Sequence, residues 1–395
     1  MRVLLFTGKG GVGKTTAAAG TAVLAARRGL KTLVLSTDAA HSLADALGVA
    51  AGPEPVEAGD GLYVQQVDTQ RRFQQAWGEV RDYVLAVLDS AGVDAVAAEE
   101  LTVLPGADEV LALLELRDQV RSGRWDLVVV DCAPTAETLR LLALPEALGW
   151  FVQRVFPPER QVARSLRPVL GKVAGLPMPR DGVLEALARL HAELAEVREV
   201  LTDPGTSVRL VLTPEAVVVA EARRTLTSLA LFGYRVDGVV ANRVFPAGGA
   251  ADPWREGWVR AQAAQLEEIE HSFAPLPVLR APYCDAEPVG AHALGSLAET
   301  LYRAVDPFAA PTSESTLAVE RSGDEFVLTI ALPFADRDEM ELVRAGDELV
   351  LTVGSARRVL ALPGALRRCT VVGAALRDGV LRIRFEPDPA LWMGL

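Results

Sequence analysis

One loop near the N-terminus limits the fold of this chain more than any other feature. The apolar run Val3–Thr7 leads into a glycine-rich segment that matches the phosphate-binding pattern G-x-x-x-x-G-K-[ST]. The segment consists of Gly8, Lys9, Gly10, Gly11, Val12, Gly13, Lys14, Thr15 and Thr16. In such a loop the glycines let the backbone curl, so that amides and the N-terminus of the next helix point at one polyphosphate. The sequence therefore predicts a strand, a nucleotide-binding loop and a helix in succession.

The loop contains two lysines, Lys9 and Lys14. Lys14 is placed to reach the β and γ phosphates of a nucleotide, and the hydroxyl of Thr15 is placed to bind Mg²⁺. A plain glycine-rich turn between a strand and a helix would explain neither Lys14 nor Lys9. Lysine is otherwise rare here, because the 40 basic residues include only Lys9, Lys14, Lys31 and Lys172 besides arginine.

Composition limits the class of protein. The chain has 395 residues, half of them hydrophobic, which is enough for two or three globular domains. A net charge of −12 argues against a general nucleic-acid binder, because phosphate contacts need a basic surface. The sequence shows no long apolar span and no signal-peptide pattern, and we expect a cytoplasmic protein. The three cysteines are isolated, without a disulfide or C-x-x-C pattern.

Short apolar runs alternate with helical stretches over the first 305 or so residues. The candidate strands are Val3–Thr7, Lys31–Ser36, Leu127–Val130, Val208–Leu212, Val236–Ala241 and Val278–Arg280. Nearly continuous Val and Leu are typical of parallel strands covered by helices on both faces. We expect a doubly wound, mostly parallel α/β domain over residues 1–308.

A helical insertion is predicted at about 146–206, where the alternation stops. Its apolar residues at helical spacing are Leu187, Leu190, Leu194, Val197 and Leu201. This face is expected to lie toward the core or a dimer partner, and a client-binding groove is the alternative.

In the C-terminal part, apolar residues recur at every second position. Residues 309–315 are rich in Pro, Ala and Ser and are predicted to be a linker. Beyond them, apolar residues alternate in 326–332, 349–353 and 380–385, with turn signals between these runs. This pattern predicts a small β-sandwich over residues 316–388.

Two carboxylates stand at the ends of predicted strands. Asp38 follows the second strand, where a group can orient the water that attacks a γ phosphate. Asp131 ends the strand Leu127–Val130, a position typical of a magnesium-side carboxylate. Either aspartate could instead only cap the next helix.

Taken together, these motifs resemble one family. They are the loop with two lysines, Ser36–Leu43, Pro105–Glu109, Asp131–Leu142, Thr213–Glu215, Asn242–Arg243, and Pro282 with Glu287 and Gly290. Over residues 1–305 the chain looks like the arsenite-pump (ArsA) and tail-anchored-protein-targeting ATPases.

The resemblance implies a homodimer that hydrolyses ATP with Mg²⁺ and closes around two nucleotides. Lys9 would reach the partner's phosphates, and Asp38 would orient the water. Asn242 and Pro282 would hold the adenine, and Asp131 would start the second switch. The implied client is a hydrophobic protein or a small molecule, and membrane association would be transient at most.

Several residues depart from the family pattern. Ala39, Cys132, Ala136 and Glu137 stand where the family usually has Pro, Thr, Gly and His. The thiol cluster that an arsenite pump needs is missing, and so is the C-x-x-C pair with which the targeting ATPases clamp their dimer. An arsenite-pump subunit therefore remains only an alternative.

The C-terminal segment resembles the small heat-shock (α-crystallin-like) fold at Leu362–Leu366 and Asp378–Leu381. The isolated I-x-I tail that links α-crystallin domains is absent from Asp388–Leu395. We expect an appended interaction module, with an ATP-regulated holdase chaperone as a further alternative.

Overall fold

The computed structural model describes residues 1–37, 42–67, 107–132, 181–248, 252–310 and 317–391; the side chains of 107–110, 181–188, 190 and 191 are left aside. The chain folds into two compact units. The first comprises Met1–Gln66, Gly123–Leu139 and Leu201–Leu395, and the second comprises Val67–Ser122 and Arg140–Val200. Within the described ranges no helix has the length and apolar content needed to cross a lipid bilayer.

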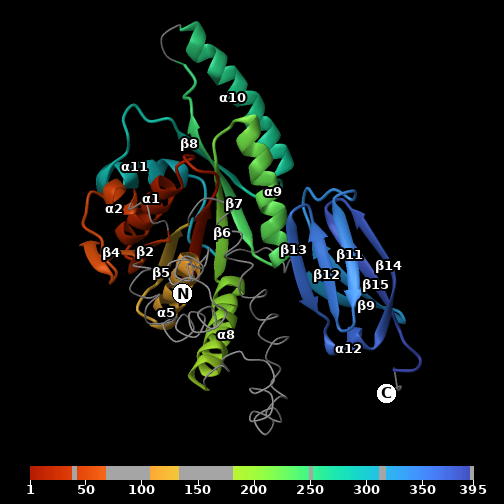
Figure 1. Cartoon of the computed structure of the whole chain (residues 1–395). Coiled ribbons are helices and arrows are strands. Elements are labelled where there is room, and N and C mark those ends of the chain that lie inside the picture. Colours follow the sequence, from red (N-terminus) through yellow and green to blue (C-terminus); the bar gives the residue numbers. More distant parts are fainter. Residues whose placement is uncertain (38–41, 68–106, 133–180, 249–251, 311–316, 392–395) are drawn as a thin grey trace, which may run out of the picture. The chain divides into compact units, whose positions relative to one another are not determined.

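An eight-stranded sheet is the centre of the first unit (Figure 1). Its strands are β1 (Arg2–Thr7), β2 (Thr32–Ser36), β3 (Val56–Gly59), β4 (Leu62–Gln66), β5 (Leu127–Asp131), β6 (Thr206–Leu212), β7 (Val236–Val244) and β8 (Val278–Pro282). Their order is β3-β4-β2-β5-β1-β6-β7-β8, and only the edge pair β3 and β4 is antiparallel. Because β1, β2, β5 and β6 are buried along their whole length, Val and Leu predominate in their sequences, and their polar residues lie at the strand ends except for Arg209 of β6.

Helices cover both faces of this sheet. They are α1 (Lys14–Arg27), α2 (Ser42–Leu47), α9 (Ala216–Phe232), α10 (Pro253–Ser272) and α11 (Gly290–Leu301). Figure 1 shows α1, α2 and α11 on one side of the sheet and α9 on the other. The chain leaves α9 at Gly233, whose left-handed backbone (φ 87°) ends the helix as the sequence predicts. The doubly wound α/β fold is thus confirmed.

A second part of the chain, which consists mainly of β-strands, begins at Leu317. Its strands are β9 (Leu317–Ser322), β10 (Glu325–Ala331), β11 (Met340–Ala345), β12 (Glu348–Val353), β13 (Ala356–Ala361), β14 (Cys369–Arg377) and β15 (Val380–Pro387), with the short helix α12 (Gly364–Arg367) before β14. They form a sheet of order β14-β15-β10-β9 and a sheet of order β11-β12-β13. Alternate residues such as Ile330, Leu351 and Ile383 fill the core between the two sheets. The β-sandwich is confirmed, whereas its boundary with the linker stays a prediction because 311–316 lie outside the described residues.

Among the described residues, the second unit consists of α5 (Ala107–Arg121) and most of α8 (Asp181–Thr202). Arg117 forms ion pairs with Glu193 (3.7 Å) and Glu196 (3.4 Å), which join the two helices. The side chains of Leu194 and Val197 are fully buried, as expected for a core-facing helix. The predicted insertion at 146–206 lies for the most part outside the described residues.

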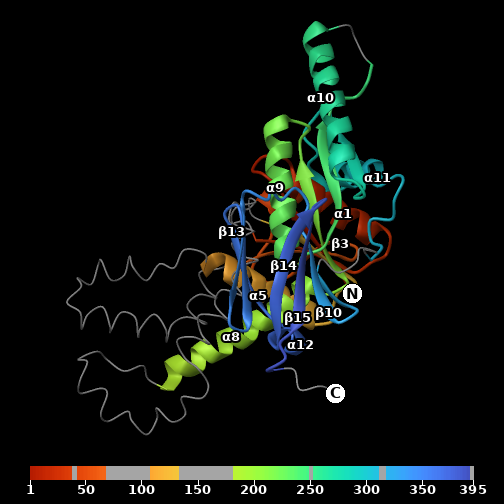
Figure 2. The same ribbon diagram turned by 90° about the vertical axis from the view of Figure 1, so that its right-hand side faces the viewer.

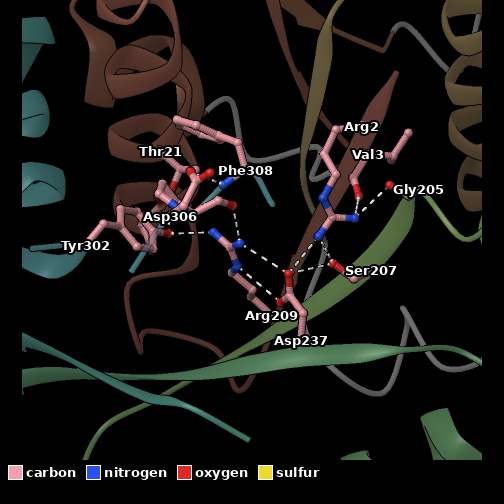
Figure 3. A network of polar contacts seen from close by, with 12 residues as sticks. Arg2, Val3, Thr21, Gly205, Ser207, Arg209, Asp237, Tyr302, Asp306 and Phe308 are labelled. Carbon is pink, nitrogen blue, oxygen red and sulfur yellow. Dashed lines mark hydrogen bonds and ion pairs between the residues drawn. The ribbon is translucent and has the colours of Figure 1, made fainter. Parts of the chain in front are cut away.

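A buried polar network ties β1, β6 and β7 together at the amino ends of the strands (Figure 3). The carboxylate of Asp237 accepts hydrogen bonds from Arg2 (2.8 Å), Ser207 (2.7 Å) and Arg209 (3.1 Å). Arg209 also donates to the carbonyl oxygen of Pro307, where the chain leaves the α/β part. Burial favours the neutral form of Arg209, but Tyr302 and Asp237 outweigh it and raise the pKa of this guanidinium.

Candidate functional site

The glycine-rich loop connects β1 to α1 at the carboxyl edge of the sheet, between β5 and β6. Two of its glycines are required by close approaches of other parts of the chain. A Cβ atom on Gly8 would lie 2.1 Å from the backbone oxygen of Val211 on β6, and one on Gly13 would lie 2.2 Å from Nδ2 of Asn242 on β7. Gly13 also has a left-handed backbone (φ 97°). The loop is therefore held between neighbouring strands by contacts that only glycine permits.

The opposite side of the loop is open. Cβ atoms added to Gly10 or Gly11 would meet nothing within 4 Å, among the residues that the structure describes. No side chain caps the N-terminus of α1 within the same residues, so its first amides and the positive end of its dipole face this space. An open cradle of amides at a helix N-terminus fits the phosphates of a nucleotide.

The two lysines of the loop lie in different environments. Lys14 is buried in the first turn of α1, and its Nζ donates to the carbonyl oxygen of Lys9 at 3.3 Å. Lys9 is partly exposed, and its Nζ lies 3.7 Å from a carboxylate oxygen of Glu221 on α9. Lys14 thus stays with its own loop, whereas Lys9 is held by a weak, solvent-accessible ion pair.

The predicted magnesium residues come from adjacent elements. Thr15 is the second residue of α1 and its Oγ1 lies 3.4 Å from Oγ of Ser42, while the neighbouring Thr16 is half-buried. Asp131 is buried at the end of β5, where it pairs with Phe6 of β1 and Ser36 of β2. The structure therefore brings Asp131 to the strand that carries the loop.

The pKa of the Cys132 thiol is shifted by its burial and by the charges of neighbouring residues. Burial, followed by the negative charge of Asp131, raises its pKa from an ordinary 9.0 to about 12. The positive charge of Lys14 and the hydrogen bond with Phe6 act in the opposite direction. Asp131, Cys132 and Lys14 are therefore electrostatic neighbours.

Asp38 lies outside the described residues, so its role stays a prediction. The residue before it is placed, because the amide of Thr37 donates to the backbone oxygen of Asp131 at 3.0 Å. The strand end that precedes Asp38 is thus joined to the strand end that carries Asp131.

The structure gives Asn242 a contact that the sequence did not suggest. Its Nδ2 donates to the backbone oxygen of Val12 at 2.8 Å, and its side chain is buried. Asn242, which was predicted to hold adenine, therefore also supports the phosphate loop. Pro282 ends β8 beside Val244 of β7 and lines a cavity of about 430 Å³ with Phe245.

Gln262 on α10 fixes the segment that follows Asn242, and sequence analysis did not identify it. Its amide donates to the backbone oxygen of Arg243 (3.0 Å) and accepts from the amide of Phe245 (2.8 Å). Arg243 itself has a left-handed backbone (φ 58°), which is uncommon outside glycine. Nothing in the local sequence distinguishes Gln262 from the other polar residues of α10, because its contacts are with a different element.

Comparisons with known proteins agree with this geometry. The family model for anion-transporting ATPases (ArsA) matches residues 1–303, and the model for the HSP20-like domain found in ArsA matches residues 323–385. The chain is 45% identical over 394 residues to an uncharacterized protein of Streptomyces coelicolor, covering 99% of each chain.

Two further relatives have names that describe an activity. A protein of Chlorobaculum tepidum whose name assigns it to the arsenical pump-driving ATPases is 36% identical over 390 residues, which cover 98% of this chain and 96% of that protein. The ATPase GET3 of Chaetomium globosum is 29% identical over 323 residues, which cover 79% of this chain and 92% of that one. The chain therefore belongs to the ArsA family of anion-transporting ATPases, which hydrolyse ATP, and its residues 323–385 belong to the HSP20-like domain found in that family.

Proposed function

We propose that the protein is a homodimeric, Mg²⁺-dependent ATPase switch that binds a hydrophobic client, a protein or a small molecule, according to its nucleotide state. The observation that carries this proposal is the contrast between the two lysines of the loop. Lys14 stays with its own loop, whereas Lys9 is partly exposed and, among the described residues, forms an ion pair only with Glu221. A cation in that position is available to the phosphates of a second copy.

The residues of the site divide the work of phosphoryl transfer. The amides of the loop and Lys14 would hold the phosphates, and Thr15 with Asp131 would hold the magnesium ion directly or through water. Bound magnesium supplies positive charge that offsets the charge developing on the phosphoryl group. Asp38 would orient the attacking water, and Asn242 and Pro282 would border the base.

An exposed aromatic cluster supports self-association. Phe245 stacks on Tyr283 with ring centroids 5.1 Å apart, and Trp254 and Trp258 of α10 complete the cluster. The side chains of Trp254 and Tyr283 are 65% and 48% exposed. Aromatic surface of this kind is typical of protein interfaces. Phe245 follows the last residue of β7, the strand that carries Asn242, and Tyr283 follows Pro282 at the end of β8.

The cysteines bear on the arsenite alternative. Cys132 and Cys369 are buried at the end of β5 and at the start of β14, and Cys284 follows β8. Within the described ranges, His, Cys, Asp and Glu form no group of three that could hold a metal ion. A hydrophobic client is therefore favoured over arsenite, and we expect arsenite to leave the ATPase rate unchanged.

Mixing two inactive variants tests whether Lys9 acts on the partner. Lys9→Ala and Asp38→Asn should each abolish turnover while ATP binding is retained. In a mixed dimer, the Lys9→Ala subunit keeps its own Asp38 and receives Lys9 from the other subunit. An equimolar mixture should therefore recover about a quarter of wild-type turnover, because about half of the dimers are mixed and each has one complete site. A mixture that stays inactive while forming dimers would contradict the proposal.

Client binding has a separate test. Asp38→Asn with Mg-ATP should retain an apolar peptide or a hydrophobic dye that the protein with ADP releases. Deletion of residues 312–395 should leave this binding in place. If that deletion abolished it, a holdase chaperone that acts through the β-sandwich would replace the switch.

A further inference from the structure

The β-sandwich carries a groove lined by arginines on the outer face of the sheet β14-β15-β10-β9, the face that Figure 2 presents through β14 and β15. Its volume is about 530 Å³. The residues that supply its charge are Arg377 at the end of β14 and Arg382 and Arg384 on β15. The proposed ATPase cycle gives none of them a role.

The alternation of β15 explains why two arginines share one face. Leu381, Ile383 and Phe385 are fully buried in the core of the sandwich. Arg382 and Arg384 lie between them and therefore point outward, about 7 Å apart along the strand. Arg377 on the neighbouring strand is in register with Val380 of β15.

Small residues on β14 make the groove concave. Gly373 is in register with Arg384, and Ala375 is in register with Arg382. A Cβ atom on Gly373 would lie 3.3 Å from Nη2 of Arg384, so the guanidinium extends over the glycine. Because Gly373 and Ala375 have small side chains or none, β14 leaves space open beside the arginines of β15.

Two of the three arginines have no charged partner among the described residues. Among the described residues, Arg377 and Arg382 form no hydrogen bond and no ion pair, and Arg384 has only a contact of 3.7 Å with Glu325. Among the residues that the structure describes, Asp378 is the only acidic one that lines the groove itself. The groove is thus a basic site on a chain whose net charge is −12.

The groove continues into a cavity with a mixed lining, in which apolar residues lie beside Arg235 and Glu320. A second cavity of about 620 Å³ shares Val327, Val380 and Arg382 with it, and Phe273 and Pro275 from the end of α10 help to line that cavity. A ligand that follows the groove would therefore meet the arginines first and then the apolar residues Phe273 and Pro275, with Glu320 disfavouring a further carboxylate at that end.

We propose that this groove binds an acidic, extended segment of a partner protein. Carboxylates on alternate residues of an extended chain repeat at the same spacing as Arg382 and Arg384, and guanidinium groups bind carboxylates through paired hydrogen bonds. An apolar residue after the acidic stretch would enter the second cavity. A nucleic acid fits less well, because its contacts need a broad basic surface and the chain is acidic overall.

Fluorescence anisotropy with defined peptides tests this proposal on the full-length protein. The probe is a labelled peptide of twelve residues in which Glu and Val alternate, and the comparison peptides carry Gln or Lys in place of Glu. We expect binding of the Glu peptide alone, weakened at high salt. The variant with both Arg377→Gln and Arg382→Gln should bind it at least about tenfold more weakly, as two lost ion pairs imply.

Arg357→Gln is the matched control, because Arg357 is an exposed arginine on β13, in the other sheet. It should leave peptide binding unchanged, and all variants should keep the wild-type ATPase rate and melting temperature. Equal binding by the double variant, or equal binding of the Gln peptide, would overturn the proposal. Tighter binding of a single-stranded oligonucleotide or of anionic lipid vesicles, lost in the same variant, would also overturn it in favour of those ligands.

Discussion

Single glycines decide whether the phosphate loop can form at all. Gly8 lies against the backbone oxygen of Val211, which cannot move without distorting β6. Gly8→Ala should therefore lower the free energy of unfolding by about 1–3 kcal/mol, the usual cost of overpacking. Gly10→Ala is the control, since its Cβ would meet nothing within 4 Å among the described residues. Urea denaturation without nucleotide measures both variants, and equal losses would contradict this account.

The thiol of Cys132 should make stability depend on pH in the alkaline range. Its pKa is about 12 in the folded chain against 9.0 ordinarily, so between these values the unfolded chain releases a proton that the folded chain keeps. Stability from this group is complete below pH 9 and falls by about 1.4 kcal/mol per pH unit above it.

Comparison with Cys132→Ala isolates this effect, because tyrosines and lysines titrate equally in both proteins. The difference in unfolding free energy between wild type and variant should stay constant from pH 7 to 8.5 and then shrink up to pH 10.5. A difference that does not change with pH would show that the thiol ionises equally in the folded and unfolded chains.

At the scale of residues, the sequence predicted which loop residues bind phosphate, but it did not predict which residues elsewhere in the chain hold the site in place. Lys14 and Thr15 belong to a local pattern whose spacing is visible in the chain. Asn242 reaches Val12 across 230 positions, and Gln262 fixes a loop of another element. Such contacts depend on the order of strands in the sheet, which a single sequence does not specify.

Among the helices, α9 connects the nucleotide site to the β-sandwich. Glu221 near its N-terminus contacts Lys9 of the loop. Two turns later, the hydroxyl of Thr227 donates to the carbonyl oxygen of Pro333 at 2.6 Å, and Leu231 is part of the core of the sandwich. A displacement of α9 when Lys9 leaves Glu221 would therefore reach the β-sandwich directly.

Replacing Thr227 by Val tests the end of α9 that carries the sandwich. Thr227→Val keeps the shape of the side chain and removes the hydrogen bond to Pro333, which should lower the free energy of unfolding by about 1 kcal/mol. Thr225→Val is a close control, because within the described part of the chain its hydroxyl bonds only to the backbone of its own helix at Glu221. Calorimetry should show the loss for Thr227→Val and a smaller change for Thr225→Val.

The strands that were predicted correctly have a clear hydrophobic pattern in their sequences. Buried strands such as β1 and β5 are unbroken apolar runs, and β10, β12 and β15 alternate. Six strands of the structure were not predicted: β3, β4, β9, β11, β13 and β14. Among them, β3 and β9 have the sequences VEAG and LAVERS, which are largely exposed and carry no clear period. Their pairing with β4 and β10 comes from the neighbouring strand and not from their own residues.

For the whole molecule, the network around Asp237 is the joint between the nucleotide-binding part and the appended domain. Asp237 is the counter-charge of both Arg2 at the start of β1 and Arg209 on β6, and all three side chains are at least nine-tenths buried. Arg209 also holds the backbone at Pro307, and Arg28 lies over the ring of Phe308. The point where the chain leaves the α/β part is thus fixed from inside the sheet.

Removing this counter-charge should destabilise the whole first unit and not one strand. Asp237→Asn keeps the size of the side chain but leaves two buried guanidinium groups without a negative partner, which costs about 3–5 kcal/mol. Glu299→Gln is the control, because its partner Arg27 and Glu299 itself are exposed and such pairs contribute about 0–1 kcal/mol. Urea unfolding followed by far-ultraviolet circular dichroism, which reports on both the α/β part and the β-sandwich, should show a large loss only for Asp237→Asn. If the β-sandwich then unfolded in a separate transition at wild-type urea concentration, the network would stabilise the α/β part alone; one shifted transition would show that Asp237 couples the two.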